Sequence, residues 1–228
     1  MARHRPAAAF MTVCGLSAAV AGWLISSAPQ PSPADVGSVP VSGDRSATSG
    51  RTTASPPTHI RGPKNLDVAV VPVASLADGA LALPEDLGTG GWWALGAAVG
   101  SSQGTVLIAG HVDTHENGLG PFAALHELPL GARIEVTAAD GQVHAYQVNA
   151  RRTYRQEQLP ADLFAGDGVH RLVLVTCAGP YDRTAGRYQR NLVLYATPVA
   201  MKGRAADRPG PFRTTLIWMP SSSLQWSR

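Results

Sequence analysis

The stretch that decides the fold is LVLVTCAGPYDRTAGRYQRNLVLYA, residues 172–196. Two apolar runs, 172–175 and 192–196, flank a polar segment that holds a Gly-Pro pair and other turn-forming residues. Short runs rich in Val and Leu, separated by turn residues, predict two β-strands. Cys177 follows the first run directly, so its side chain is expected at the end of a strand, at the rim of the sheet.

The same pattern recurs upstream of this stretch. TVLIAG (105–110) is an apolar run ended by glycine, and residues 132–138 and 144–155 alternate around an Asp140-Gly141 turn. Alternation on both sides of Asp-Gly predicts a β-hairpin. A short helical stretch is expected over 122–131, before the hairpin. Together these segments predict an all-β domain, a closed barrel of seven to eight strands with one or two short helices.

The N-terminus predicts a membrane segment. Residues 1–6 carry two arginines, and residues 7–28 are uncharged and mostly apolar. A run of ~20 such residues is enough to cross a bilayer as a helix. Positive charge before the run places the N-terminus in the cytoplasm and the rest of the chain outside the cell. The small residues Ser26-Ser27-Ala28 leave a cleaved signal peptide as the alternative to an anchor, whereas Trp23 favours the anchor.

The remaining segments are low in large apolar residues or lack periodicity. Residues 29–62 are rich in Pro, Ser and Thr, which predicts a disordered stalk before a folded domain at 63–200. The basic tail, 201–228, is expected to be poorly ordered. The formal net charge of +3 gives no reason to expect a nucleic-acid partner.

The folded part of the chain holds one cysteine, Cys177, because Cys14 lies in the apolar N-terminal run. An unpaired thiol in an exported protein is expected to be either buried or used in chemistry. A nearby cation would favour the thiolate, and an arginine can also bind the oxyanion that forms when a thiolate attacks a carbonyl. His111, just after the 105–110 run, is a candidate proton carrier for such a nucleophile.

Two other functions compete with a cysteine nucleophile. In GHVDTHE (110–116), His111, Asp113 and His115 are potential metal ligands of a hydrolase, although His115 and Glu116 are also ordinary loop residues. A non-catalytic β-domain that binds the cell wall or a partner protein, with Cys177 as a core thiol, is the second alternative. The S-x-G-C context of L,D-transpeptidases is absent around Cys177.

Several of these segments resemble one family. LVLVTC resembles the L-x-T-C signature of sortases, the cysteine transpeptidases of Gram-positive bacteria, and TVLIAGHVDT is similar to their catalytic-histidine segment. RNLVLYA resembles their final strand. PKNLDVAVVPV and GWWALGAAVGSSQG are similar to the actinobacterial members called class E or F. The resemblance spans residues 63–200 and implies a sortase-like β-barrel.

The resemblance also implies roles for individual residues. Cys177 corresponds to the nucleophile and His111 to the general acid and base, and Thr176 would line the substrate groove. The position of the family's arginine holds Asn191, with Arg190 one residue earlier. Arg190 is the chosen candidate because it is nearest, with Arg187 and Asn191 as the alternatives. One residue along a strand reverses the face, so this choice depends on the register.

The implied reaction is transpeptidation without a metal or other cofactor. Cys177 would cleave an LPxTG-like sorting signal of a surface protein and form a thioester. An amine of a cell-wall precursor or of a pilin would then release the enzyme. The implied location is the cell membrane, with a single-pass anchor and an extracellular catalytic domain.

Overall fold

The computed structural model of the protein describes residues 34–40, 53–76, 80–114 and 116–200. Its strands and 3-10 helices run, in chain order, as β1 (Val36–Gly37), β2 (Pro57–Gly62), β3 (Leu66–Val73), β4 (Thr89–Trp93), β5 (Thr105–Ala109), β6 (Asp113–Thr114), β7 (Gly118–Leu119), η2 (Pro121–His126), β8 (Arg133–Ala138), β9 (Val143–Arg155), η3 (Gln156–Gln158), η4 (Ala161–Phe164), β10 (Arg171–Asp182) and β11 (Arg187–Val199).

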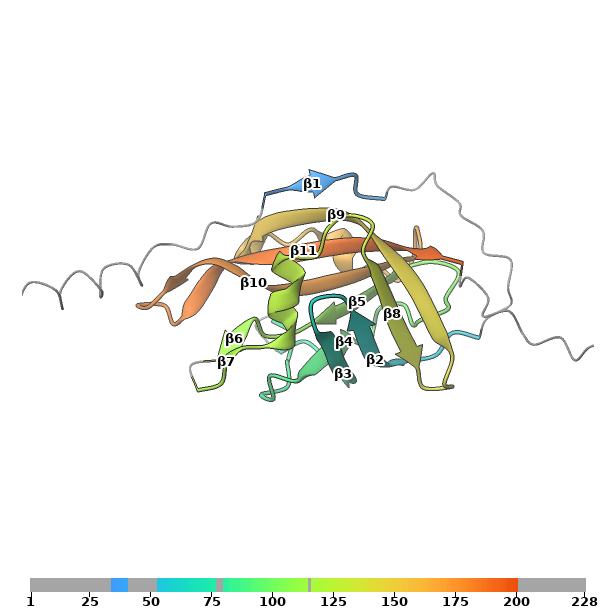
Figure 1. The fold of residues 1–228 in the computed structure, drawn as a ribbon, viewed down its shortest axis with the longest axis horizontal. Helices are drawn as coiled ribbons and strands as arrows, with labels where there is room; N and C mark the ends of the chain where they lie inside the picture. Colours follow the sequence, from blue (N-terminus) through green and yellow to red (C-terminus); the bar gives the residue numbers. More distant parts are fainter. Residues whose placement is uncertain (1–33, 41–52, 77–79, 115, 201–228) are drawn as a thin grey trace, which may run out of the picture.

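The main sheet closes on itself. Its strands follow the order β9-β11-β10-β5-β4-β3-β2-β8, and β8 pairs again with β9, while β1 adds to β9 from outside (Figure 1). Closure removes the free edges of an open sheet. The pairs β3–β4 and β5–β10 are parallel, and the other neighbours in the barrel are antiparallel. The predicted all-β closed barrel is therefore confirmed, as is the hairpin between β8 and β9.

Strands β10 and β11 are buried on both faces, which explains their continuous apolar runs. One face of each strand packs inside the barrel, and the other face packs against a second cluster formed by the loops outside it. The interior side chains are Leu172, Leu174, Leu192 and Leu194, and the outer ones are Val173, Val175, Val193 and Tyr195. Residue 177 continues the outer series, so Cys177 belongs to the outer face of the barrel.

The folded domain begins earlier than the sequence predicts. Residues 57–62, placed in the disordered stalk of 29–62, form strand β2, which pairs with β3 and β8. Only Pro57 and Ile60 of this strand are buried, so its sequence carries little apolar signal. Strand β1 also falls in the predicted stalk, and Arg152 donates hydrogen bonds to the carbonyl oxygens of Val36 at 2.6 Å and Gly37 at 2.7 Å.

The predicted membrane segment at 7–28 and the tail at 201–228 lie outside the described residues. Within the described ranges, no helix has the length and apolar character that a membrane span requires. The helical stretch expected over 122–131 is the 3-10 helix η2, and its buried Phe122, Ala124 and Leu125 pack into the interior of the barrel.

Burial of three histidines predicts a pH-dependent stability. Burial is the main cause that lowers the pKa of His126, His144 and His170 below 6.5. The unfolded chain then binds protons more readily than the folded protein. Stability should be complete above about pH 6.5 and fall as the pH drops towards the lower folded-state values.

Thermal unfolding at about pH 8 and about pH 5.5 tests this expectation. We expect a lower Tm at the acidic pH. In the double variant His144→Gln/His170→Gln, the difference in Tm between the two pH values should be smaller than in the wild type. A Tm that stays constant or rises on acidification would contradict it.

Candidate active site

Two neighbouring parallel strands bring His111 and Cys177 to the same end of the barrel. Ala109 of β5 is paired with Val175 of β10, and the N–H of Gly110 donates to the Val175 carbonyl oxygen at 3.1 Å. Parallel strands run in the same direction, so the residues two positions further along both strands leave at one edge. His111 and Cys177 occupy those positions, although 66 residues separate them in the chain.

Thr176 fixes the two strand ends to each other from inside the barrel. Its side chain is only 3% exposed, and its hydroxyl donates to the Gly110 carbonyl oxygen at 2.8 Å. Strand alternation turns the Thr176 side chain away from the face of Cys177, so that lining of a substrate groove by Thr176 stays a prediction. The residue positions the segment that carries His111.

Gly110 allows the chain to pass close to η2 just before His111. A Cβ atom at this position would lie 2.3 Å from the ring of Phe122. Any larger residue would therefore push either the ring or the His111 segment out of place. The glycine of the AGH sequence is thus required by packing.

The contacts of His111 determine which ring nitrogen is basic. Its Nε2 lies 3.1 Å from the carbonyl oxygen of Pro84, in the segment between β3 and β4. A carbonyl oxygen only accepts, so Nε2 carries the proton in this arrangement and donates. In the neutral ring Nδ1 then holds the lone pair and is the nitrogen that can accept a proton.

Cys177 is partly exposed, and its main chain is held by a second histidine. Nε2 of His126, at the end of η2, donates to the Cys177 carbonyl oxygen at 3.1 Å. The Val175 carbonyl oxygen points towards β5, and by strand alternation that of Cys177 points the same way. Since β5 has ended at this level, the His126 ring supplies the donor that the missing strand would have supplied.

Two causes raise the pKa of the Cys177 thiol: burial first, and the negative charge of Asp113 second. Both disfavour the thiolate, so the resting site holds a neutral thiol. Asp113, in β6, also accepts a hydrogen bond from the hydroxyl of Tyr188 at 2.6 Å. Burial and this bond raise the pKa of Tyr188, which therefore remains a hydrogen-bond donor.

The contacts of Asp113 also bear on the alternative metal site. Its Oδ2 binds Tyr188 and the Nε2 of His111 binds Pro84, so the two side chains are engaged with different partners. The third residue of that set, His115, lies outside the described residues. Among the residues that are described, no group of three or more His, Cys, Asp and Glu side chains has an arrangement suited to a metal ion.

The register of β10 and β11 places Asn191, not Arg190, beside Cys177. Cys177 is directly opposite Asn191, and Ala178 is opposite Arg190. Directly opposed residues of an antiparallel pair share a face, so Arg190 projects with Ala178 on the other face. The bulge in this hairpin begins after Ala178 and does not restore Arg190 to the face of Cys177.

The amide of Asn191 is free to act on a ligand. The residue is 9% exposed, and its side chain has no hydrogen-bond partner among the residues that the structure describes. Arg187, the other alternative, is exposed near the hairpin turn and forms an ion pair with Glu157 at 2.9 Å. The structure therefore places Asn191 on the face of Cys177, Arg190 on the opposite face, and Arg187 in an ion pair near the hairpin turn.

Removal of the Asp113 charge should make Cys177 more reactive. Asp113→Asn retains an oxygen that accepts the Tyr188 hydrogen bond but removes the charge that opposes thiolate formation. We expect the pKa of the Cys177 thiol to fall, so that alkylation by iodoacetamide begins at a lower pH than in the wild type.

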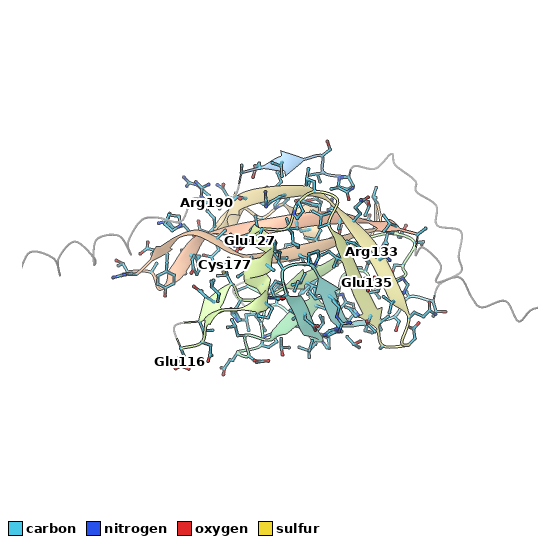
Figure 2. The ribbon with its side chains drawn as sticks, in the orientation of Figure 1. Glu116, Glu127, Arg133, Glu135, Cys177 and Arg190 are labelled. Atoms are coloured by element: carbon cyan, nitrogen blue, oxygen red, sulfur yellow. The ribbon has the colours of Figure 1, made fainter. Side chains whose placement is uncertain are left out.

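The matched control is Glu116→Gln, which removes a negative charge from the same loop. Figure 2 shows Glu116 at the edge of the molecule, on the turn between β6 and β7 and away from Cys177. An unchanged alkylation profile for Asp113→Asn, or an equal shift for Glu116→Gln, would contradict the effect assigned to Asp113.

Three residues of the site were not identified from the sequence. His126 and Tyr188 reach the site across 51 and 75 residues of chain, and Pro84 contributes a main-chain carbonyl group. No local motif indicates such contacts. Two aromatic residues in the hairpin that follows the cysteine, Tyr181 and Tyr188, were the available signal.

Comparisons with known proteins agree with this geometry. The family model described as "Sortase domain" matches residues 64–199. Among curated proteins, none matches the chain. Sortase C1 of Streptococcus agalactiae, solved in complex with MTSET, is similar with a TM-score of 0.50 and 21% identity, over 64% of this chain and 69% of that chain.

A second similar structure is a lid mutant of sortase A from Corynebacterium diphtheriae. Its TM-score is 0.51 at 17% identity, over 68% of this chain and 76% of that chain. At these identities the two structures support the fold alone. The family model covers more than half of the chain, so this protein belongs to the sortase family of cysteine transpeptidases.

Proposed function

We propose that the protein is a membrane-anchored, extracellular sortase that cuts an LPxTG-like sorting signal and joins the cut protein to an amine of the cell wall or of a pilin. The observation that carries this proposal is the meeting of three groups on adjacent strands. His111 follows β5, Cys177 lies on β10, and Asn191 lies opposite Cys177 on β11. A base, a nucleophile and a neutral hydrogen-bond donor are what acyl transfer through a thioester requires.

The first half of the reaction forms the acyl-enzyme. Nδ1 of His111 takes the proton of the Cys177 thiol as Sγ attacks the carbonyl carbon of the scissile peptide bond. The oxyanion of the tetrahedral intermediate accepts a hydrogen bond from the Asn191 amide. When the C–N bond breaks, His111 gives the same proton to the leaving amine, and the acyl group stays on Sγ as a thioester.

The second half returns the enzyme to its resting state. An amine attacks the thioester carbon while Nδ1 of His111 takes a proton from its nitrogen. The C–S bond then breaks, and His111 returns this proton to the sulfur, which leaves a new amide and a neutral thiol. The raised pKa of the Cys177 thiol favours this last protonation step, because a basic thiolate is readily protonated.

A ligation assay tests the proposed reaction. The full-length protein is incubated with a library of sorting-signal peptides and an amine, and ligated products are identified by mass. We expect a product that joins the N-terminal peptide fragment to the amine, and none with Cys177→Ala. Failure of every peptide to react, or ligation by Cys177→Ala, would contradict the proposal.

A further inference from the structure

A polar cleft of about 270 Å³ lies beside the β10–β11 hairpin, on the C-terminal side of Cys177. Its walls come from the end of β9, from η3 and from the hairpin. The arginines that line it are Arg155, Arg187 and Arg190, and the acidic residues are Glu157 and Asp182. The positive side chains therefore outnumber the negative ones.

The acidic residues are already engaged. Glu157 pairs with Arg187 at 2.9 Å, and Oδ1 of Asp182 accepts the main-chain N–H groups of Thr184 at 2.9 Å and Ala185 at 3.0 Å. These contacts hold the wall of the cleft together. Among the residues that the structure describes, two of the three guanidinium groups have no negative partner.

Those two, Arg155 and Arg190, are directly opposite each other on β9 and β11. Like charges at directly opposed positions of a sheet repel and destabilise the pair. Neither guanidinium group has a hydrogen bond or an ion pair within the described part of the chain. An anion between them would relieve the repulsion, and a carboxylate matches guanidinium geometry with two parallel hydrogen bonds.

The cleft adjoins the hairpin segment that follows Cys177. The aliphatic part of Arg190 lies against Gly179, since a Cβ atom on that glycine would be 3.3 Å from Cδ and Cγ of Arg190. Tyr188, also on the cleft wall, donates to Asp113, whose charge acts on Cys177. Tyr188 therefore belongs both to the wall of the cleft and to the surroundings of Cys177.

We propose that this cleft binds a carboxylate of the amine acceptor, so that the protein prefers amines that carry a free carboxylate, such as a diamino acid in its acid form. This inference rests on the proposed function, because an acceptor enters only after an acyl-enzyme has formed. Arg155 and Arg190 are the carboxylate ligands, and binding there brings the amino group towards the thioester of Cys177.

The test measures acceptor preference. The wild-type acyl-enzyme is reacted with a diamino acid and with its carboxamide, and kcat/KM for each acceptor is compared. We expect the free acid to be favoured by about tenfold, and the preference to fall to within about twofold in Arg155→Gln. The matched control is Arg183→Gln, which removes a positive charge from the same hairpin outside the cleft wall and should keep the preference.

Two results would overturn the inference: equal use of the acid and the carboxamide by the wild type, or an unchanged preference in Arg155→Gln. A second arm varies acidic residues in the sorting-signal peptide with a neutral acceptor. An Arg155→Gln effect confined to acidic peptides would place the carboxylate on the sorting signal and overturn the acceptor assignment.

A binding measurement keeps this test independent of catalysis. The Nε–H resonance of Arg155 is expected to shift when the full-length protein is titrated with the diamino acid, and not with its carboxamide. No shift with the acid would count against the cleft as a carboxylate site. Absence of an acyl-enzyme with any peptide, by contrast, would contradict the proposed function itself.

Discussion

Replacement of His111 by alanine is expected to lower kcat/KM for peptide cleavage by about 10²–10⁴-fold, the usual contribution of a positioned acid and base. The expected loss is large because Cys177 rests as a neutral thiol, so its proton must be removed during attack. The leaving amine needs the same proton, and His111 is the histidine at the matching strand end. Initial rates of peptide cleavage measure the effect.

The matched control for His111→Ala is His59→Gln. His59 lies in β2 and pairs with Asp67 at 2.7 Å, and neither residue contacts the site. Its replacement should leave the cleavage rate within about twofold of the wild type, as expected of surface changes away from a site. A loss of less than about tenfold for His111→Ala would remove His111 from the mechanism.

Replacement of Asn191 by alanine is expected to lower kcat by about 10²–10³-fold, as found when one oxyanion donor is removed. The strand register puts its amide on the face of Cys177, where the oxyanion of the attacked carbonyl forms. Asn191→Asp tests the hydrogen bond itself, because it keeps the shape of the side chain but replaces the N–H donors by a charged acceptor. It should be at least as damaging as alanine.

Arg190→Gln separates the two candidates for this role. Since Arg190 shares the face of Ala178, its loss should reduce the rate of acyl-enzyme formation by less than about tenfold. The rate is measured by single-turnover release of the C-terminal peptide fragment. A greater loss for Arg190→Gln than for Asn191→Ala would restore the arginine as the oxyanion donor and contradict the register argument.

The barrel was predictable from the sequence because its strands carry local signals. The apolar runs at 105–110, 172–175 and 192–196, and the Asp140-Gly141 turn, each mark an element that the structure contains. The start of the domain was not predictable in the same way. Strand β2 buries only two of its six residues, so PTHIRG resembles the polar segment before it.

The types of residue in the site were predictable from the sequence, but the strand pairing that brings them together was not. Cys177 and His111 stand out as an unpaired thiol and a histidine that each follow an apolar run. Their proximity depends on the parallel pairing of β5 with β10, a non-local contact that no turn signal specifies. The choice between Arg190 and Asn191 depended on a one-residue difference in strand register, which the pairing with Cys177 decides in the structure.

The central claim is that Cys177 carries the acyl group. The most direct test is the intact mass of the full-length protein after it is mixed with an intact sorting-signal peptide that it cleaves and is then quenched in acid. The predicted result is a mass increase equal to the N-terminal peptide fragment, mapped to Cys177. The increase should be retained in Cys14→Ala, which removes the other cysteine, and lost in Cys177→Ala. An adduct that survives in Cys177→Ala, or cleavage of the peptide without any adduct on the wild-type protein, would contradict it.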